Sequence, residues 1–327
     1  MRRSVPLARW VGYLAGRGVF AALALLPTQT ARSVGRRLGL LFFRLSPRHR
    51  RIALENIASA FGDTLDASGR RALARESFAH LGMIAADAPL FRRHLRTPRS
   101  RVAWIEGADH LISAAALGRG VLVFSGHYGH WELVALLQPQ LGVPMTMVVS
   151  PMRNPLFDRY FTRLRSLSGN TILSKRNAAR PILKALRDRQ AVAILIDQNV
   201  RGEGGIFIDF FGRLASTTPA LATLALRSGA PIVPVFSRFL PDGRLAISYR
   251  EPIRPIPQGG IEDDIRALMQ ACTAILEEEI RRHPECWLWM HDRWRTRPRP
   301  VPATGDARTA PPDEKVGAAA GGQEARA

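Results

Sequence analysis

The stretch from Val121 to Leu133 holds the residues of this chain that are best suited to chemistry. An apolar run ends in Ser-Gly, and the next six residues include two histidines, a tryptophan and a glutamate. An imidazole can take a proton from a hydroxyl, and a nearby carboxylate can fix the ring tautomer and stabilise the imidazolium that forms. We therefore interpret His127 and Glu132 as a general base and its carboxylate partner.

The spacing of His127 and Glu132 requires a loop between them. On one continuous helix, residues five apart point about 140° away from each other, because each residue turns the helix by about 100°. The two side chains can meet if His127 precedes the first turn and Glu132 lies within it, and Gly126 and Gly129 permit such a sharp turn. A short His-x4-Glu pattern also arises by chance, so a capped turn with an incidental histidine is the structural alternative.

Two other catalytic interpretations fit this stretch less well. A zinc site would use His127, His130 and Glu132, but the spacing differs from His-Glu-x-x-His and no obvious cluster supplies another ligand. A serine hydrolase would need Gly-x-Ser-x-Gly, which is absent, and Phe124-Ser125-Gly126 does not fit it. The histidine–carboxylate dyad is therefore favoured, and we expect no metal ion or cofactor.

Strand and helix patterns alternate from about residue 102 onward. Strands are predicted at 121–124, 145–149, 191–196, 231–236 and, more weakly, 245–249; helices at about 131–139, 155–167, 178–188, 217–228 and 261–282. This alternation predicts an α/β fold with a mainly parallel central sheet flanked by helices. Such sheets carry their chemistry at the carboxyl ends of the strands. His127 and the pair Asp197-Gln198 both follow predicted strands.

The chain divides into three predicted regions. Residues 1–30 contain an apolar stretch, interrupted by Arg17, that is marginal for the roughly 20 residues of a spanning helix, which indicates a membrane anchor or an interfacial helix. A buried first helix is the alternative. Residues 31–298 form the folded domain, with a helical part at 31–100 and an α/β core at 101–298. Residues 299–327 are rich in Pro, Ala, Gly and charge, and are predicted to be a disordered tail.

The composition favours an anionic partner. The chain carries 47 Lys and Arg against 27 Asp and Glu, a formal net charge of +20. Nucleic acid, an anionic membrane surface or an acidic carrier protein would each suit this charge. Only two cysteines are present, which fits a reducing, cytosolic setting better than a disulfide scaffold.

The segments around the dyad resemble the bacterial lipid A biosynthesis acyltransferases, within the glycerolipid and lysophospholipid acyltransferase superfamily. His127 and Glu132 match the superfamily's His-x4-Asp/Glu motif. The segment 126–132 is similar to the family's Gly-His-x-Gly-Asn-Trp-Glu, with His130 where asparagine is common. The resemblance covers about residues 8–298, and its further blocks follow in order at 105–107, 154–165, 197–219, 229–235 and 284–294.

The resemblance implies a glycerol-phosphate-acyltransferase-like fold and transfer of a fatty acyl group from a thioester to a hydroxyl. The donor would be acylated acyl carrier protein, or acyl-CoA, and the acceptor a lipid A precursor, attacked directly with no acyl-enzyme. It also implies the inner (cytoplasmic) membrane, with the catalytic domain facing the cytoplasm. The expected partners are acyl carrier protein and anionic membrane lipids, and no nucleic acid.

Two alternatives to this activity stay open. One is an acyl-CoA-dependent enzyme that acylates another glycolipid, such as a phosphatidylinositol mannoside. The other is a non-enzymatic basic protein that binds membranes or nucleic acid, which the charge alone would allow. The ordered motif blocks argue against the second.

The predicted substrate-binding residues lie in the downstream blocks. Arg165 is the first choice to stabilise an oxyanion or a phosphate and Arg163 the second, and at most one enters the site because residues two apart point to different faces of a helix. Asp197 could bind a sugar hydroxyl or pair with an arginine, with Gln198 beside it. For each of these residues a surface or capping role is the alternative.

Two further groups of residues have open interpretations. Ser216 and Thr217 are predicted at a helix N-cap, where a phosphate could also bind. The C-terminal tryptophans could pack in the core or lie at a membrane interface; they are Trp287, Trp289 and Trp294.

Overall fold

The computed structural model describes residues 6–298, and the tail predicted at 299–327 lies outside the described residues. The first part of the described chain is helical, as expected. Its helices are α1 (Leu7–Leu25), α2 (Thr28–Leu45), α3 (Pro47–Phe61), α4 (Ala67–Asp87) and α5 (Phe91–Arg96). Helix α1 carries Arg9 and Arg17, and within residues 6–298 no helix combines the length and apolarity needed to cross a bilayer.

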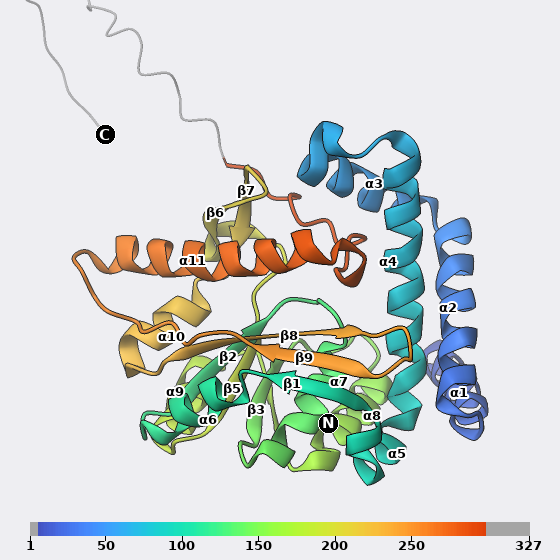
Figure 1. Cartoon of the computed structure of the whole chain (residues 1–327), viewed down its shortest axis with the longest axis horizontal. Helices are drawn as coiled ribbons and strands as arrows, with labels where there is room; N and C mark the ends of the chain where they lie inside the picture. Colours follow the sequence, from blue (N-terminus) through green and yellow to red (C-terminus); the bar gives the residue numbers. More distant parts are fainter. Residues whose placement is uncertain (1–5, 299–327) are drawn as a thin grey trace, which may run out of the picture. The chain divides into compact units, whose positions relative to one another are not determined.

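Helices α2 and α4 run side by side along one edge of the molecule (Figure 1). Three glycines allow this close packing. A Cβ atom at Gly82 would clash with the backbone oxygen of Gly35, and one at Gly39 would clash with that of Phe78. The close approach of the two backbones explains why the helical part is tightly joined although α2 is rich in arginine.

A seven-stranded sheet forms the centre of the α/β part, in the order β1-β9-β8-β2-β5-β3-β4. Its strands are β1 (Val102–Glu106), β2 (Val121–Ser125), β3 (Met145–Val149), β4 (Thr171–Ser174), β5 (Ala191–Leu195), β8 (Ile232–Phe239) and β9 (Leu245–Tyr249). Five neighbouring strands are parallel, and β9 with β1 runs against them. This confirms the mainly parallel sheet and all five predicted strands. Strands β1 and β4 were not predicted.

A separate antiparallel hairpin, β6 (Ile206–Phe210) and β7 (Arg213–Thr217), was also missed. It packs on the long helix α11 (Ile261–Arg282). The turn between its strands consists of Phe211 and Gly212, both with positive φ, at 57° and 71°. Such a two-residue turn suits the twist of a hairpin, and Gly was its sequence signal.

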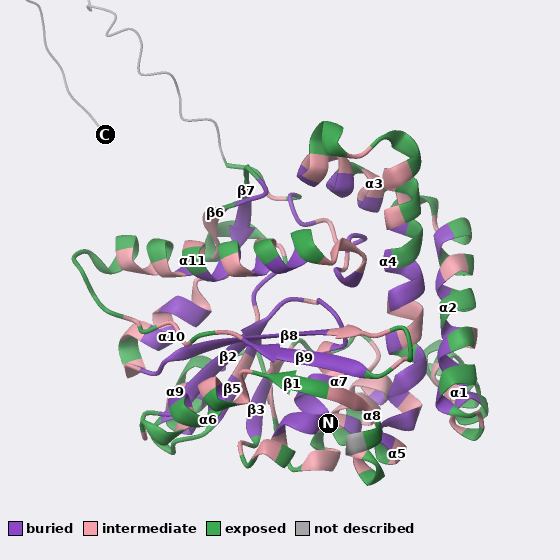
Figure 2. Ribbon diagram, in the orientation of Figure 1, coloured by how far each residue is buried: buried purple, intermediate pink, exposed green. Residues whose placement is uncertain are grey.

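The central strand β2 is buried along its whole length because helices cover both faces of the sheet (Figure 2). Phe124 packs in the core shared with α9 (Ala179–Arg187), α10 (Ala220–Ser228) and α11. Val123 packs in the core shared with α6 (Ala108–Ala116) and α7 (Trp131–Leu137). The alternation follows from the two-residue period of a strand, and it places the end of β2 between two helical layers.

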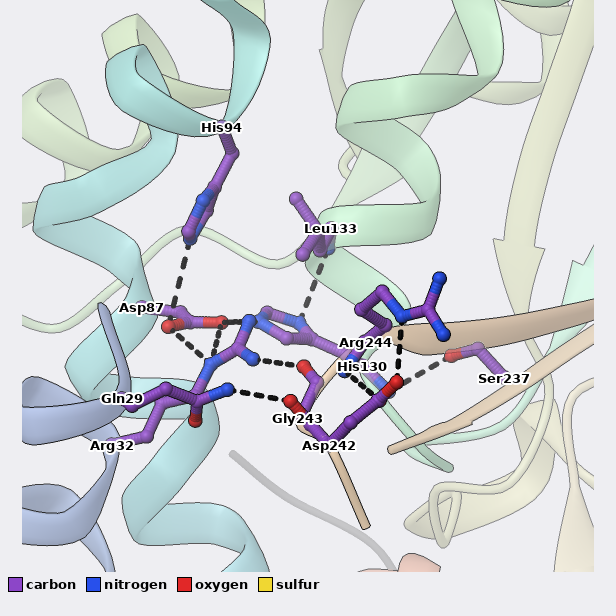
Figure 3. Close-up of polar contacts among 10 residues, drawn as sticks. All are labelled: Gln29, Arg32, Asp87, His94, His130, Leu133, Ser237, Asp242, Gly243 and Arg244. Carbon is purple, nitrogen blue, oxygen red and sulfur yellow. Dashed lines mark hydrogen bonds and ion pairs between the residues drawn. The ribbon is translucent and has the colours of Figure 1, made fainter. Parts of the chain in front are cut away.

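A buried cluster of charged and polar side chains joins the helical part to the loop after β2 (Figure 3). Arg32 on α2 donates through Nε to both carboxylate oxygens of Asp87, at 2.9 Å each. The Nε2 atom of His130 lies 3.2 Å from Oδ2 of the same carboxylate. Asp87 and His130 are fully buried and Arg32 is 3% exposed. Burial acts to raise the pKa of Asp87, but hydrogen bonds from His130, His94 and Arg32 hold that pKa well below its usual range.

We expect Asp87→Asn to lower the free energy of unfolding by about 3–5 kcal/mol, because it leaves the buried Arg32 charge without its counterion. Glu76→Gln is the matched control on the same helix, since Glu76 pairs with Arg36 at an exposed site and such pairs contribute about 0–1 kcal/mol. Urea denaturation followed by circular dichroism measures both. Equal losses in the two variants would contradict a special role for the buried cluster.

Candidate functional site

The loop that follows β2 is held rigidly before α7 begins. Gly129 has φ 56°, and a Cβ atom there would clash with the backbone oxygen of Ser237. The backbone N–H of His130 donates to Ser237 Oγ at 3.0 Å, and His130 Nδ1 accepts from the N–H of Leu133 at 3.2 Å. His130 therefore caps α7 and fixes where the first helical turn, with Glu132, begins.

His127 lies in this loop and is held by Asp197, which directly follows β5 and Ile196. The imidazole Nδ1 lies 2.8 Å from Asp197 Oδ1, and the backbone N–H of His127 donates to Asp197 Oδ2 at 2.7 Å. Strands β2 and β5 are paired in parallel with Ser125 opposite Leu195, so both chains leave the sheet at the same edge. A proton on Nδ1 that is donated to Asp197 leaves the lone pair of Nε2 free to act as a base.

Nε2 of His127 faces Gln198, whose Nε2 lies 3.3 Å away. The His127 side chain is 19% exposed and that of Asp197 is 3% exposed. The carboxylate is thus withdrawn from solvent while the outer ring nitrogen stays accessible. This is the arrangement of a base and the group that orients it.

The predicted contact between His127 and Glu132 is not formed. Glu132 instead accepts two hydrogen bonds from Arg165 on α8 (Pro155–Arg165), at 2.8 Å from Nε and 2.5 Å from the second guanidinium nitrogen. The reason is that α7 begins only at Trp131, which turns Glu132 toward α8 while His127 points to the end of β5. Asp197, predicted to bind a sugar hydroxyl or an arginine, is the group that holds the imidazole.

The charges around His127 favour its protonated form. Burial lowers the pKa of His127, but the charge of Asp197 and the hydrogen bond to it outweigh burial, and Glu132 adds to their effect. The net result is a pKa above the ordinary 6.5. Burial acts to raise the pKa of Asp197, yet His127 and Trp287 hold that pKa below its usual range. Asp197 therefore stays a carboxylate at neutral pH.

A large cavity of about 1160 Å³ opens from His127. Glu132 and Arg165 also line it. Its apolar walls lie on both faces of the sheet; they include Val134, Met145 and Met147 near α7, and Ile182, Leu183 and Leu224 on α9 and α10. Three cations line it as well, namely Lys175, Arg201 and Arg227. Within residues 6–298 none of these three forms an ion pair.

The other predicted site residues differ in whether they reach the cavity. Arg163 is exposed on α8 while Arg165 turns inward, as expected for residues two apart. Gln198 lines the cavity. Ser216 and Thr217 do not cap a helix; they belong to β7 and are buried.

Arg293 forms hydrogen bonds with both Ser216 and Thr217. Its guanidinium donates to the backbone oxygen of Ser216 at 2.7 Å and to the hydroxyl of Thr217. Helix α10 starts later, at Ala220, whose N–H donates to Thr218 Oγ1 at 3.3 Å. The cavity correspondingly reaches Thr218 rather than the two residues before it.

His130 is unsuited to the zinc interpretation. Its Nε2 faces Asp87 and its Nδ1 accepts from Leu133, so neither ring nitrogen points toward His127 or Glu132. Within the described residues no group of His, Cys, Asp and Glu is arranged to hold a metal ion.

Trp287 is the site residue that sequence analysis did not identify. Its indole N–H donates to Asp197 Oδ2 at 2.9 Å, and the residue is only 1% exposed. Of the two interpretations of the C-terminal tryptophans, the buried one is confirmed, since Trp289 and Trp294 are buried too. The signal that could have indicated its role is the density of Trp, His and Arg directly after the last helix.

Comparison with known proteins connects this geometry to a family. A family model described as bacterial lipid A biosynthesis acyltransferase matches residues 2–296. The lipid A biosynthesis palmitoleoyltransferase of Escherichia coli is 31% identical over 86% of this chain and 90% of its own length. The lipid A biosynthesis lauroyltransferase of the same organism is 28% identical over 90% and 94%.

Two further acyltransferases are more distantly similar to this chain. The phosphatidylinositol mannoside acyltransferase of Mycolicibacterium smegmatis is 26% identical over 57% of this chain and 60% of its own. Among solved structures, the 1-acyl-sn-glycerophosphate acyltransferase of Thermotoga maritima aligns with a TM-score of 0.36 and 15% identity, over 76% of this chain and 98% of that one.

We expect the imidazole of His127 to titrate above pH 6.5, and Asp197→Asn to lower its pKa by about 1–3 units, because the neutral amide removes the nearby negative charge. NMR titration of imidazole-labelled protein measures both values. His80 is an internal control, since burial lowers its pKa to about 4 and it should not respond. An unchanged His127 pKa in the variant would contradict the pairing with Asp197.

Proposed function

Because the chain belongs to the bacterial lipid A biosynthesis acyltransferase family and is therefore an acyltransferase, we propose that it transfers a fatty acyl group to a hydroxyl of a lipid A precursor. The donor we propose is an acylated acyl carrier protein. Membership of this family excludes the interpretation of the chain as a purely non-enzymatic binding protein. No metal ion or cofactor takes part in the proposed reaction.

His127 acts as the base of the proposed reaction. Its Nε2 takes the proton of the acceptor hydroxyl while the oxygen attacks the thioester carbonyl carbon, forming the new C–O bond. The C–S bond then breaks, and the imidazolium returns the proton to the departing thiolate. Asp197 holds the imidazole and stabilises its charge between the two steps. Gln198, which faces Nε2 in the free protein, yields this place to the hydroxyl.

Arg165 and Glu132 line the same cavity as His127. The guanidinium uses Nε and one terminal nitrogen for Glu132, which leaves its other terminal nitrogen free to donate. We assign this nitrogen to the oxyanion that develops on the thioester carbonyl. Glu132 then acts by orienting Arg165, and its charge also favours the imidazolium form of His127.

The cavity is the observation that supports this function best. It joins the accessible base to long apolar walls, as expected for a site that must hold an acyl chain beside a reacting hydroxyl. The cations Lys175, Arg201 and Arg227 suit the phosphates of a lipid A precursor or of the donor's phosphopantetheine arm. The excess positive charge of the chain also favours an acidic carrier protein.

We further propose that the protein lies on the cytoplasmic face of the inner membrane through α1. Its outward face is apolar, with Leu7, Trp10, Val11 and Leu14 each at least 43% exposed. The opposite face packs on α8, where Tyr13 contacts Phe157 edge-on. A helix with one buried and one exposed apolar face suits the bilayer interface, and the exposed arginines of α2 suit anionic lipid headgroups.

The acceptor and the donor are tested together in one transfer assay. Wild-type protein, His127→Ala and His110→Ala receive labelled acyl–acyl carrier protein and lipid A precursor, and product lipid is measured by mass spectrometry. We expect His127→Ala to lose about 10²–10⁴-fold in rate, because the base is removed. His110→Ala, on α6 outside the cavity, should keep the wild-type rate.

Other outcomes of this assay identify the alternatives. Equal rates in wild type and His127→Ala would contradict the assigned base. Transfer only from acyl-CoA, and only to a phosphatidylinositol mannoside, would move the substrates to those of the more distant relative while keeping the chemistry.

We expect Val11→Glu with Leu14→Glu to reduce flotation with phosphatidylglycerol vesicles at least tenfold, because burying each aliphatic side chain is worth about 1.5–3 kcal/mol. The control is Ile256→Glu, which is 67% exposed in the loop between β9 and α11 and does not belong to α1. Equal flotation of the two variants would contradict binding through α1.

A further inference from the structure

The segment after α11 lies directly against the catalytic loop. The backbone N–H of Gly129 donates to the carbonyl of Cys286 at 2.9 Å, and Tyr128 forms an isolated antiparallel bridge with Trp287. The segment is itself anchored to the helical part, because Ser77 Oγ donates to the carbonyl of Trp287 at 2.7 Å. These contacts give Trp287 a fixed position beside the base.

Within residues 6–298, the Asp197 carboxylate forms hydrogen bonds with two residues, His127 and Trp287. His127 occupies Oδ1 through its ring and shares Oδ2 through its backbone N–H. The indole N–H takes the remaining direction of Oδ2 at 2.9 Å. The ring also packs edge-on against Phe210, with the centroids 5.5 Å apart.

We propose that Trp287 is a positioning residue of the acyl-transfer site: its indole N–H fixes the Asp197 carboxylate and draws off part of its negative charge, which sets how strongly His127 holds a proton. This inference rests on the proposed function, in which His127 is the base. It adds a residue that is distant in sequence and does not line the cavity.

The direction of the effect follows from the hydrogen bond. A donor to a carboxylate stabilises its charge, so Asp197 without the indole N–H attracts a proton more strongly and stabilises the neighbouring imidazolium more. One such hydrogen bond corresponds to about 0.5–1 unit in the pKa of Asp197 itself, and the coupled change in the pKa of His127 is a fraction of it. Trp287→Phe should therefore raise the pKa of His127 and move the acid limb of kcat/KM to higher pH by that smaller amount. The other charged groups near the pair are unchanged; they are Glu132 on α7, Arg165 on α8, and His291 and Arg293 in the C-terminal segment.

Trp289→Phe is the matched control. Trp289 is fully buried in the same segment, and its indole N–H donates at 2.6 Å to the carbonyl of Pro284, which is not part of the site. The two substitutions remove the same atoms and one hydrogen bond each. Loss of packing should therefore affect them alike, and only Trp287→Phe removes a donor to Asp197.

The experiment compares wild type, Trp287→Phe and Trp289→Phe by NMR titration of His127 and by the pH profile of kcat/KM. We expect an upward shift in both measurements for Trp287→Phe, with an upper bound of about 0.5–1 unit, and none for Trp289→Phe. Equal shifts, or no shift in either variant, would overturn the proposal. If Trp287→Phe does not fold, 3-benzothienylalanine at position 287 keeps the indole shape without the N–H and should give the same shift.

The two readouts separate this inference from the proposed function. The NMR titration needs no substrate, so it decides the role of Trp287 even if no acyl transfer is detected with any donor. Absence of transfer in the wild-type protein with a shifted titration in Trp287→Phe would contradict the proposed function alone.

Discussion

A single buried carboxylate, that of Asp197, connects the segments that build the candidate site. An anion withdrawn from water is strongly disfavoured unless donors surround it. Here the donors come from the loop after β2 and from the segment after α11, while the carboxylate itself follows β5. Three segments that are far apart in the chain must therefore meet at one point, and the parallel pairing of β2 with β5 makes that meeting possible.

The place of His127 at the edge of the sheet could be predicted from the sequence, but its carboxylate partner could not. His127 stands after a continuous apolar strand in a glycine-containing loop, and such local patterns identify the carboxyl edge of a sheet. Glu132 was assigned to His127 because it is near in sequence. Asp197 is 70 residues away, and its contact depends on the order of strands in the sheet. The strand before Asp197 was predicted to within one residue, but strand patterns alone do not say that β5 lies next to β2.

The helical part contributes to the site more than its sequence indicates. Arg32 lies inside the molecule against Asp87 although α2 is rich in arginine, and His130 contacts the same carboxylate from the loop side (Figure 3). A buried ion pair contributes more to a unique arrangement than to net stability. His130 thus both caps α7 and contacts the helical part.

The placement of Trp287 has a consequence for the order in which the protein matures. The contacts of its segment reach back 210 residues to Ser77 and 90 residues to Asp197. Contacts over such separations form late, because the loops they close have a high entropy. During synthesis, the histidine and its surrounding loop therefore emerge long before the carboxylate beside them can be held in place. The arrangement of His127 and Asp197 is therefore complete only once the segment after α11 is in place, so a chain that stops before Trp287 carries the motif without a finished site.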